Sequence, residues 1–209
     1  MLLLIALVIK LESRGPVFYG DLRETIGGRT FRCWKFRTMI VGAHAKQREM
    51  LTTNQVDGPQ FKIDRDPRIT RVGAWLRRVS LDELPQLFNI ISGDMSFIGP
   101  RPSPFRENQI CIPWREARLS VRPGISGMWQ VCRSERAVGD FHQWIHYDLL
   151  YVRNLSLAVD LRLIAATCAT LATGRRIAPT WILPAAALHP GADEQPASAA
   201  KTAYDSARA

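Results

Sequence analysis

The stretch DPRITRVGAWLRRVSLDELPQLFNIISGDMSFIGPRP (residues 66–102) carries the strongest local signals for the fold. Near its centre, apolar side chains recur at the spacing of an amphipathic helix, at Leu84, Leu87, Phe88 and Ile91. Ser92-Gly93 then predicts the helix end, because glycine readily adopts the left-handed conformation that follows a helix. Residues 99–104 are rich in proline, and we expect a stiff extended loop there.

The start of this helix fits two registers. In the first, Ser80 and Glu83 form a capping box, but Pro85 then lies inside the helix, where its missing N–H costs a hydrogen bond. In the second, Asp82 is the N-cap and Pro85 takes the third position, whose N–H has no helical partner. We favour the second register, which predicts that Asp82 lies at the positive end of a helix and stays ionised.

Charged residues suited to phosphate chemistry surround this predicted turn. Glu83 adds a second carboxylate, Arg77 offers a planar guanidinium, and Arg101 lies between two prolines that restrict its loop. A carboxylate nucleophile, arginines and a divalent metal are what attack on a diphosphate requires. The residues therefore indicate a phosphoryl-transfer site, although helix capping alone would explain Asp82 and Glu83 equally well.

The remaining elements follow from composition on either side of this stretch. Residues 17–19 and 30–37 are rich in β-branched and aromatic side chains and flank Gly27-Gly28, which predicts a strand pair. Residues 69–78 fit either a strand or a helix. We expect helices over 40–51, 141–152 and 157–172, and a loop over 123–127. The predicted organisation is a partly membrane-inserted helix at 1–14, one folded domain at 15–177 and a disordered Ala- and Pro-rich tail at 178–209.

Residues 1–9 (MLLLIALVI) form an apolar segment that is too short to cross a bilayer. As a helix it would rise roughly 13 Å, less than half of a hydrocarbon core of about 30 Å. A signal peptide is not indicated, because no basic region precedes the segment and no small-residue cleavage site follows it. The segment is either a buried helix or one inserted partway into the bilayer, with Lys10 and Arg14 at the headgroups.

Composition limits the class of protein. A chain of 209 residues with 46% hydrophobic content fits one folded domain and excludes wholesale disorder. The net charge is +9, and the last thirty residues carry three acids and two bases, so the rest of the chain is +10. This excess suits nucleic acid, an anionic membrane face or a phosphorylated substrate, with a solvated basic surface as the alternative.

Metal and nucleotide motifs are largely missing. The four cysteines contain no CxxC pair, which excludes a zinc ribbon and argues against a disulfide scaffold. His142 and His146 have the spacing of zinc ligands, but no Glu follows His142, and we interpret both as surface histidines. The chain has no Walker loop, no GxGxxG after a strand and no GxSxG elbow.

Five segments together resemble the bacterial sugar transferases, the monotopic polyprenyl-phosphate phosphoglycosyl transferases, and they run in the family's order within residues 1–177. They are GPVFYGDLR (15–23), FRCWKFRTM (31–39), the stretch 66–102 quoted above, VRPGISGMWQV (121–131) and DLLYVRNLSLAVDL (148–161). The resemblance implies a mixed, helix-dominated α+β fold. It would be a single membrane-associated domain with a small strand element near 17–37 and amphipathic surface helices.

The resemblance also implies a reaction. Such enzymes move a sugar-1-phosphate from a UDP-sugar to undecaprenyl phosphate through a covalent aspartyl intermediate and release UMP, as the first step of exopolysaccharide, O-antigen or capsule assembly. The family's Asp-Glu dyad falls on Asp82 and Glu83, so Asp82 would attack and hold Mg²⁺, with Asp94 as the second candidate metal ligand. Glu83 would assist as metal or proton partner, and Arg77 and Arg101 match arginines that hold phosphate.

The same resemblance predicts the location and leaves several alternatives. We expect the protein to lie at the cytoplasmic face of the bacterial inner membrane and to have no nucleic-acid partner. A homodimer is a further possibility. Family members enter the membrane through a re-entrant helical hairpin, and Met1 falls inside its second half, so we expect the first arm to be missing. Where many relatives have a Ser-Gly-Arg-like turn, this chain reads Cys132-Arg133-Ser134. Three tryptophans are either interfacial anchors or core residues: Trp114, Trp129 and Trp144. As an alternative function, the chain would be a truncated, non-enzymatic membrane-binding relic of the family.

Overall fold

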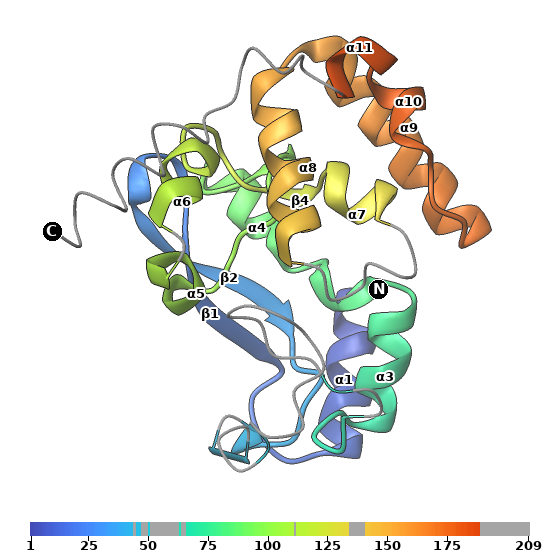
Figure 1. Ribbon diagram of the computed structural model, residues 1–209. Coiled ribbons are helices and arrows are strands. Elements are labelled where there is room, and N and C mark those ends of the chain that lie inside the picture. The colour runs from blue at the N-terminus through green and yellow to red at the C-terminus, as the bar shows by residue number, and fades with distance from the viewer. Residues whose placement is uncertain are drawn as a thin grey trace, which may run out of the picture.

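The computed structural model describes residues 1–43, 45–46, 50, 63, 66–110, 112–133 and 141–188. Over these residues the chain is a mixed α+β domain in which helices dominate, as predicted (Figure 1). Much of the helix expected over 40–51 lies outside the described residues, as does the tail beyond 188.

Two small sheets form the β component. The strands β1 (Phe18–Glu24) and β2 (Thr30–Phe36) pair antiparallel around the 3-10 turn η1 (Ile26–Gly28), which confirms the predicted strand pair and extends its first strand. The strands β3 (Ser96–Ile98) and β4 (Gly124–Ser126) pair in parallel, so part of the loop expected over 123–127 is a strand. Glycine is required at this pairing, because a Cβ on Gly124 would lie 2.2 Å from the backbone nitrogen of Gly99.

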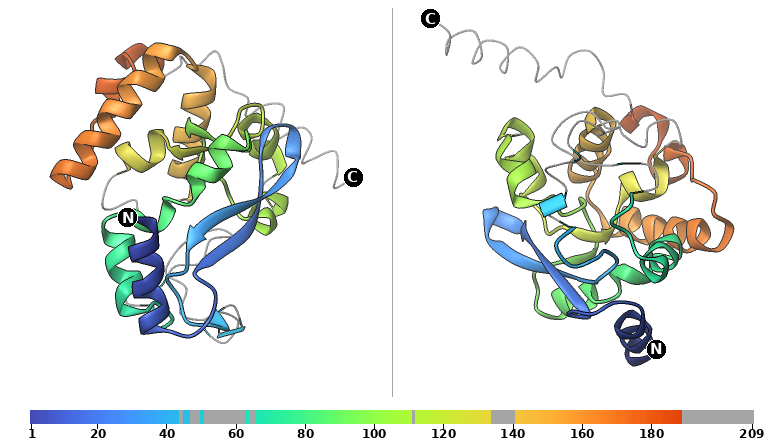
Figure 2. Two further views of the ribbon diagram at one scale, coloured as in Figure 1. Left: turned by 180° about the vertical axis from the view of Figure 1, so that it is seen from behind. Right: turned by 90° about the horizontal axis from the view of Figure 1, so that it is seen from below.

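The helices α1 (Leu2–Glu12) and α3 (Arg71–Arg78) lie side by side at one end of the domain (Figures 1 and 2). The segment that fitted a strand or a helix is therefore helical. Ile5 and Ile9 of α1 are buried against Leu76, while the other face of α1 is apolar and exposed. Thr70 is the N-cap of α3, and the carboxylate of Glu12 also accepts the backbone N–H of Val72 in the first turn, at 3.0 Å.

The helix α4 (Gln86–Ile91) has the predicted apolar stripe, but that stripe faces away from the protein. Ile91 is 82% exposed, whereas Gln86 and Asn89 are buried. Asn89 explains the orientation, because its side chain accepts from the backbone N–H of Trp34 at 3.0 Å and donates to the carbonyl of Arg32 at 2.8 Å. The amide thus satisfies the free edge of β2, and the polar face of α4 turns inward.

The largest core lies among the C-terminal helices, which cover β3 and β4 (Figure 1). The remaining helices are α5 (Phe105–Ile110), α6 (Ile112–Arg118), α7 (Met128–Cys132), α8 (Phe141–Arg153), α9 (Leu157–Thr173), α10 (Pro179–Ile182) and α11 (Ala185–Leu188). The predictions of α8 and α9 are confirmed. The predicted tail is wrong over 178–188, because Ile182 and Leu183 are buried in the core formed with α9.

The aromatic and histidine assignments are settled by burial. Trp129 and Trp144 are buried core residues, and Trp114 packs against the ring of Phe141. His142 and His146 are exposed on α8, as interpreted from the sequence. Among the described residues, no helix has the length and apolar content that crossing a bilayer would need.

Candidate active site

The carboxylates Asp82 and Glu83 lie on a tight turn between α3 and α4. This turn is the 3-10 segment η3 (Leu81–Glu83), preceded by Ser80 in the left-handed conformation with φ 59°. Asp82 is therefore not the N-cap of α4. That position belongs to Pro85, and the capping box is not formed either, because the Ser80 side chain makes no cap hydrogen bond. A non-glycine residue in this conformation stores strain, which recurs at functional sites.

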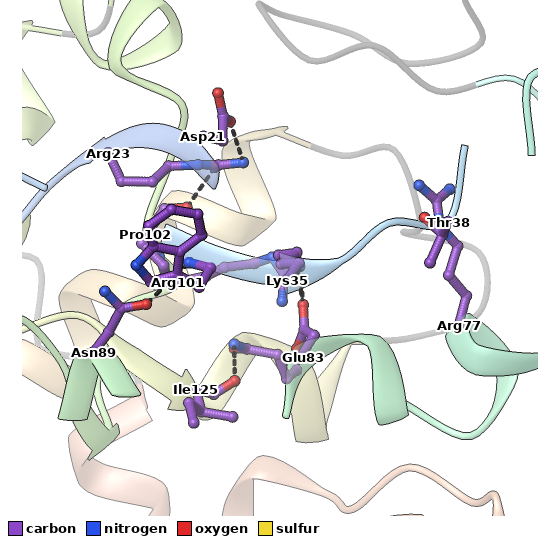
Figure 3. Close-up of polar contacts among 12 residues, drawn as sticks. Asp21, Arg23, Lys35, Thr38, Arg77, Glu83, Asn89, Arg101, Pro102 and Ile125 are labelled. Carbon is purple, nitrogen blue, oxygen red and sulfur yellow. Dashed lines mark hydrogen bonds and ion pairs between the residues drawn. The ribbon is translucent and has the colours of Figure 1, made fainter. Parts of the chain in front are cut away.

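Glu83 is held between two cations. Its Oε1 atom accepts from Lys35 Nζ at 2.7 Å and from the guanidinium of Arg101 at 2.8 Å (Figure 3). Burial alone would raise the pKa of Glu83, but Arg101 and Lys35 outweigh it and hold that pKa well below its ordinary value. Glu83 is therefore a fixed, ionised carboxylate.

Asp82 lies in a different environment from its neighbour. Its side chain is buried, at 8% exposure, and no described residue is recorded as a hydrogen-bond or ion-pair partner of its carboxylate. Burial raises the pKa of Asp82, while Lys35, Arg77 and Arg101 act in the opposite direction. The expectation that a helix N-cap keeps Asp82 ionised is thus wrong, because Asp82 is not an N-cap, and burial together with the charge of Glu83 outweighs the cations and leaves the pKa of Asp82 above its ordinary value.

The two predicted arginines occupy different sides of the dyad. Arg101 contacts Glu83 directly, whereas Arg77 lies on α3 and donates from Nε to Thr38 Oγ1 at 2.9 Å (Figure 3). The close approach of α3 to Thr38 requires Gly73, since a Cβ there would lie 2.1 Å from the Thr38 carbonyl oxygen. The site thus has a guanidinium at each side of the two carboxylates.

The loop that carries Arg101 is fixed by a buried network that sequence reasoning missed. Arg118 of α6 donates to the backbone carbonyl of Arg101 at 2.8 Å and to Asp148 Oδ2 of α8 at 2.9 Å. Its guanidinium also lies 4.5 Å from the ring centroid of Trp144. These contacts join residues far apart in the chain, so no local pattern indicates them.

A small pocket beside Glu83 adds further residues that were not predicted. It is lined by Arg23, Cys33, Lys35, Gln86, Arg101 and Pro102 together with Glu83. The sequence does hold one indication that Lys35 faces the interior. Lys35 continues the two-residue period of the buried side chains Phe31 and Cys33 along β2. A lysine in that register points inward and needs a counter-ion.

The residues that could hold a metal are the two dyad carboxylates. Mg²⁺ is commonly bound by one or two carboxylates together with substrate phosphates, so Asp82 and Glu83 fit that donor set. No cluster of three or more metal-ligating side chains occurs among the described residues. Asp94 bonds Arg29 at 2.8 Å and Ser92 at 2.8 Å, on the side of the hairpin, and no recorded contact links it to the dyad.

The small helix-rich α+β domain thus brings two carboxylates, Asp82 and Glu83, together with Arg77, Lys35 and Arg101. Such cationic groups have the chemistry that binds phosphate. Comparison with known proteins gives the family. The bacterial sugar transferase model matches residues 1–174, and the chain belongs to that family.

Individual relatives cover different amounts of their own length. The galactosyl transferase CpsE of Streptococcus agalactiae serotype III (strain NEM316) is 37% identical over 78% of this chain and 36% of its own length. The UDP-glucose:undecaprenyl-phosphate glucose-1-phosphate transferase of Xanthomonas campestris pv. campestris is 41% identical over 80% of the chain and 34% of its own length. The exopolysaccharide production protein ExoY of Rhizobium meliloti (strain 1021) is 38% identical over 84% of the chain and 78% of its own length. The chain thus spans about a third of the first two relatives.

Proposed function

We propose that this protein transfers a hexose-1-phosphate from a UDP-sugar to undecaprenyl phosphate, through a covalent intermediate on Asp82, as the first step in assembling a surface glycan. The observation that carries the proposal is the contrast within the dyad. Glu83 is clamped by Lys35 and Arg101, whereas no described residue bonds the Asp82 carboxylate, so its oxygens are not engaged by a cation as those of Glu83 are. The printed names of relatives that act on undecaprenyl phosphate support the substrate class.

The transfer has two steps. An oxygen of ionised Asp82 attacks the phosphorus that bears the sugar, and the bond from that phosphorus to the bridging oxygen breaks, so that UMP leaves with the electron pair. A phosphate oxygen of undecaprenyl phosphate then attacks the same phosphorus and displaces Asp82, which regains its carboxylate. The product is undecaprenyl diphosphate sugar, and the order of events is ping-pong.

The surrounding cations favour both steps. Arg77 and Arg101 would neutralise the phosphate oxygens that gain charge during attack, and Lys35 keeps Glu83 ionised. Asp82 and Glu83 would hold Mg²⁺, which when bound supplies positive charge to the diphosphate. Because burial raises the pKa of Asp82, the first step should be favoured at neutral and higher pH, where the carboxylate is charged.

The membrane is the proposed site of action, on the cytoplasmic face of the bacterial inner membrane. Exposed apolar side chains support this, and they gather on α1 (Leu3, Leu4, Leu7 and Leu11), α4 (Leu87, Phe88 and Ile91) and α9 (Leu157, Leu161, Ile164 and Leu171). The acceptor lipid is itself confined to a bilayer, so a peripheral enzyme must bind that surface to reach it.

The deciding experiment separates the first step from the second. Protein in lipid vesicles is mixed with Mg²⁺ and a panel of UDP-sugars labelled in the sugar, first without and then with undecaprenyl phosphate. We expect a burst of about one UMP per protein and a labelled protein adduct without acceptor, then turnover with acceptor. Asp82→Asn should lose both, whereas the control Asp94→Asn should keep both.

The contrary results are equally specific. Turnover without a labelled adduct, or an active Asp82→Asn variant, would remove the covalent intermediate. Absence of UMP with every sugar would favour the non-enzymatic membrane-binding alternative.

A further inference from the structure

Two arginines outside the assigned set lie on adjoining backbone segments near Arg101. Arg133 follows α7, and its backbone N–H donates to the Trp129 carbonyl at 3.1 Å. Arg176 follows α9 and donates from its guanidinium to the carbonyl of Gln130 at 2.8 Å. The backbone N–H of Ile177 adds a bond to the Val131 carbonyl at 3.0 Å, so the segment with Arg176 is held against α7.

The charge of this pair is uncompensated within the described part of the chain. No recorded ion pair joins Arg133 or Arg176 to a described carboxylate, and the buried Nε atom of Arg133 has no acceptor there. Burial, then Arg176 and Arg101, lower the pKa of Arg133 to about 10, and only Glu83 acts in the other direction. Since Glu83 is already engaged by Lys35 and Arg101, the positive charge has no dedicated partner among the described residues.

A buried donor without an acceptor is costly, and the cost falls when an anion supplies the missing bonds. Guanidinium groups suit phosphate in particular, because their planar donors match two of its oxygens at once. Backbone contacts place the pair near the dyad. Gly127, the residue before α7, lies against the carbonyl of Gly99, and the Gly99 N–H donates to the Ser126 carbonyl at 3.0 Å. Gly99 precedes by two residues Arg101, which bonds Glu83.

We propose that Arg133 and Arg176 form a second phosphate-binding site next to the Asp82–Glu83 dyad. It would hold a phosphate group of the substrates at a distance from the attacked phosphorus, either on the nucleotide donor or on the lipid acceptor. Arg176 lies beyond residues 1–174, the part that the family model matches. The assignment of the ligand rests on the proposed function.

The variant that tests the site is Arg176→Gln, with Arg175→Gln as its matched control. Both residues are exposed, so neither change should affect folding, and equal thermal melting of the two variants checks this. Arg175 differs in that its recorded bond comes from the backbone nitrogen, to Thr173 Oγ1 at 3.2 Å. The Arg176→Lys variant keeps the positive charge but loses the planar guanidinium, whose donors can bond two phosphate oxygens at once.

Two measurements distinguish the sources of phosphate. Calorimetric titration with UDP in the absence of lipid reports the donor, and the KM for undecaprenyl phosphate at saturating UDP-sugar reports the acceptor. We expect Arg176→Gln to weaken one of them by roughly tenfold, with Arg176→Lys intermediate and Arg175→Gln unchanged. Weaker UDP binding assigns the site to the nucleotide, and a raised acceptor KM alone assigns it to the lipid phosphate.

The site is overturned if Arg176→Gln matches Arg175→Gln in both measurements. Failure of the transferase proposal is seen separately, because it abolishes turnover in the wild type. In that event the site is tested by binding alone. UDP binding is measured by titration, and binding to vesicles with and without undecaprenyl phosphate is measured by sedimentation. The site still requires that Arg176→Gln bind either UDP or the undecaprenyl phosphate vesicles more weakly than Arg175→Gln does. Equal binding by the two variants in every case would overturn the site.

Discussion

The helices α4 and α9 both expose apolar side chains, but they bury opposite kinds of residue. The buried face of α9 consists of Val159, Leu163 and Ala166, and it packs in the largest core. The buried face of α4 consists of Gln86 and Asn89. An apolar stripe on a helix therefore identifies a face that avoids water without saying whether protein or another apolar medium covers it.

The largest expected effect comes from truncating the apolar interior of α9. Leu163 is fully buried, so Leu163→Ala should lower the free energy of unfolding by about 3 kcal/mol through lost burial and a cavity. Phe88→Ala on the exposed stripe of α4 should change it by less than about 1 kcal/mol. Urea denaturation followed by circular dichroism measures both, and equal losses would remove the contrast between the helices.

A second difference lies in the titration of buried polar groups. The buried polar side chains of α4 are neutral amides, whereas α8, beside α9, buries Asp148, and this burial raises the pKa of that carboxyl to about 6 from 3.8. The native state then retains a proton between pH 4 and 6 that the unfolded chain releases. The contribution of Asp148 to stability is therefore largest below pH 4 and is lost as pH rises to about 6.

The isosteric variant Asp148→Asn isolates this contribution. Between pH 4 and 7, wild-type stability should fall relative to the variant by at most about 3 kcal/mol, the equivalent of the shift in pKa. Urea titrations of both proteins at several pH values measure the difference. A constant difference across this range would show that Asp148 does not titrate there.

The inward polar face of α4 predicts a smaller loss at Asn89. Asn89→Leu leaves the Trp34 N–H and the Arg32 carbonyl unpaired, so it should destabilise the fold by about 2 kcal/mol despite adding apolar volume. Asn154→Ala is the control, because that amide follows α8 and donates to a single carbonyl of the helix, that of Leu150. Urea denaturation compares the two, and a neutral or stabilising Asn89→Leu would show that an apolar face can replace the polar one.

The sequence predicted those elements that local pattern determines. The hairpin around Gly27-Gly28 and the helices α8 and α9 follow from strand composition and helical periodicity within single segments. The carboxylates and arginines of the site were found in the same way, because they stand close together in a distinctive stretch.

The remainder depended on contacts between distant segments. The direction of α4 is decided by Asn89 bonding a strand 55 residues away at Trp34. The clamp on Glu83 joins residues separated by 48 and 18 positions, which no pattern along the chain reveals. The tail was misjudged because its alanines and prolines have no periodicity, although Ile182 and Leu183 are buried among the C-terminal helices.

The smallest expected effect concerns what covers the outer face of α4. If a bilayer covers it, Ile91→Ser should lower the affinity for anionic lipid vesicles by roughly fivefold, because one apolar side chain at an interface contributes about 1 kcal/mol. Its unfolding free energy in the absence of lipid should stay unchanged, since Ile91 is exposed there. The control is Ile26→Ser, which replaces an exposed isoleucine at the hairpin turn beside α6 (Figure 1). Co-sedimentation with vesicles measures both variants, and equal affinities would mean that the exposed stripe of α4 faces something other than lipid.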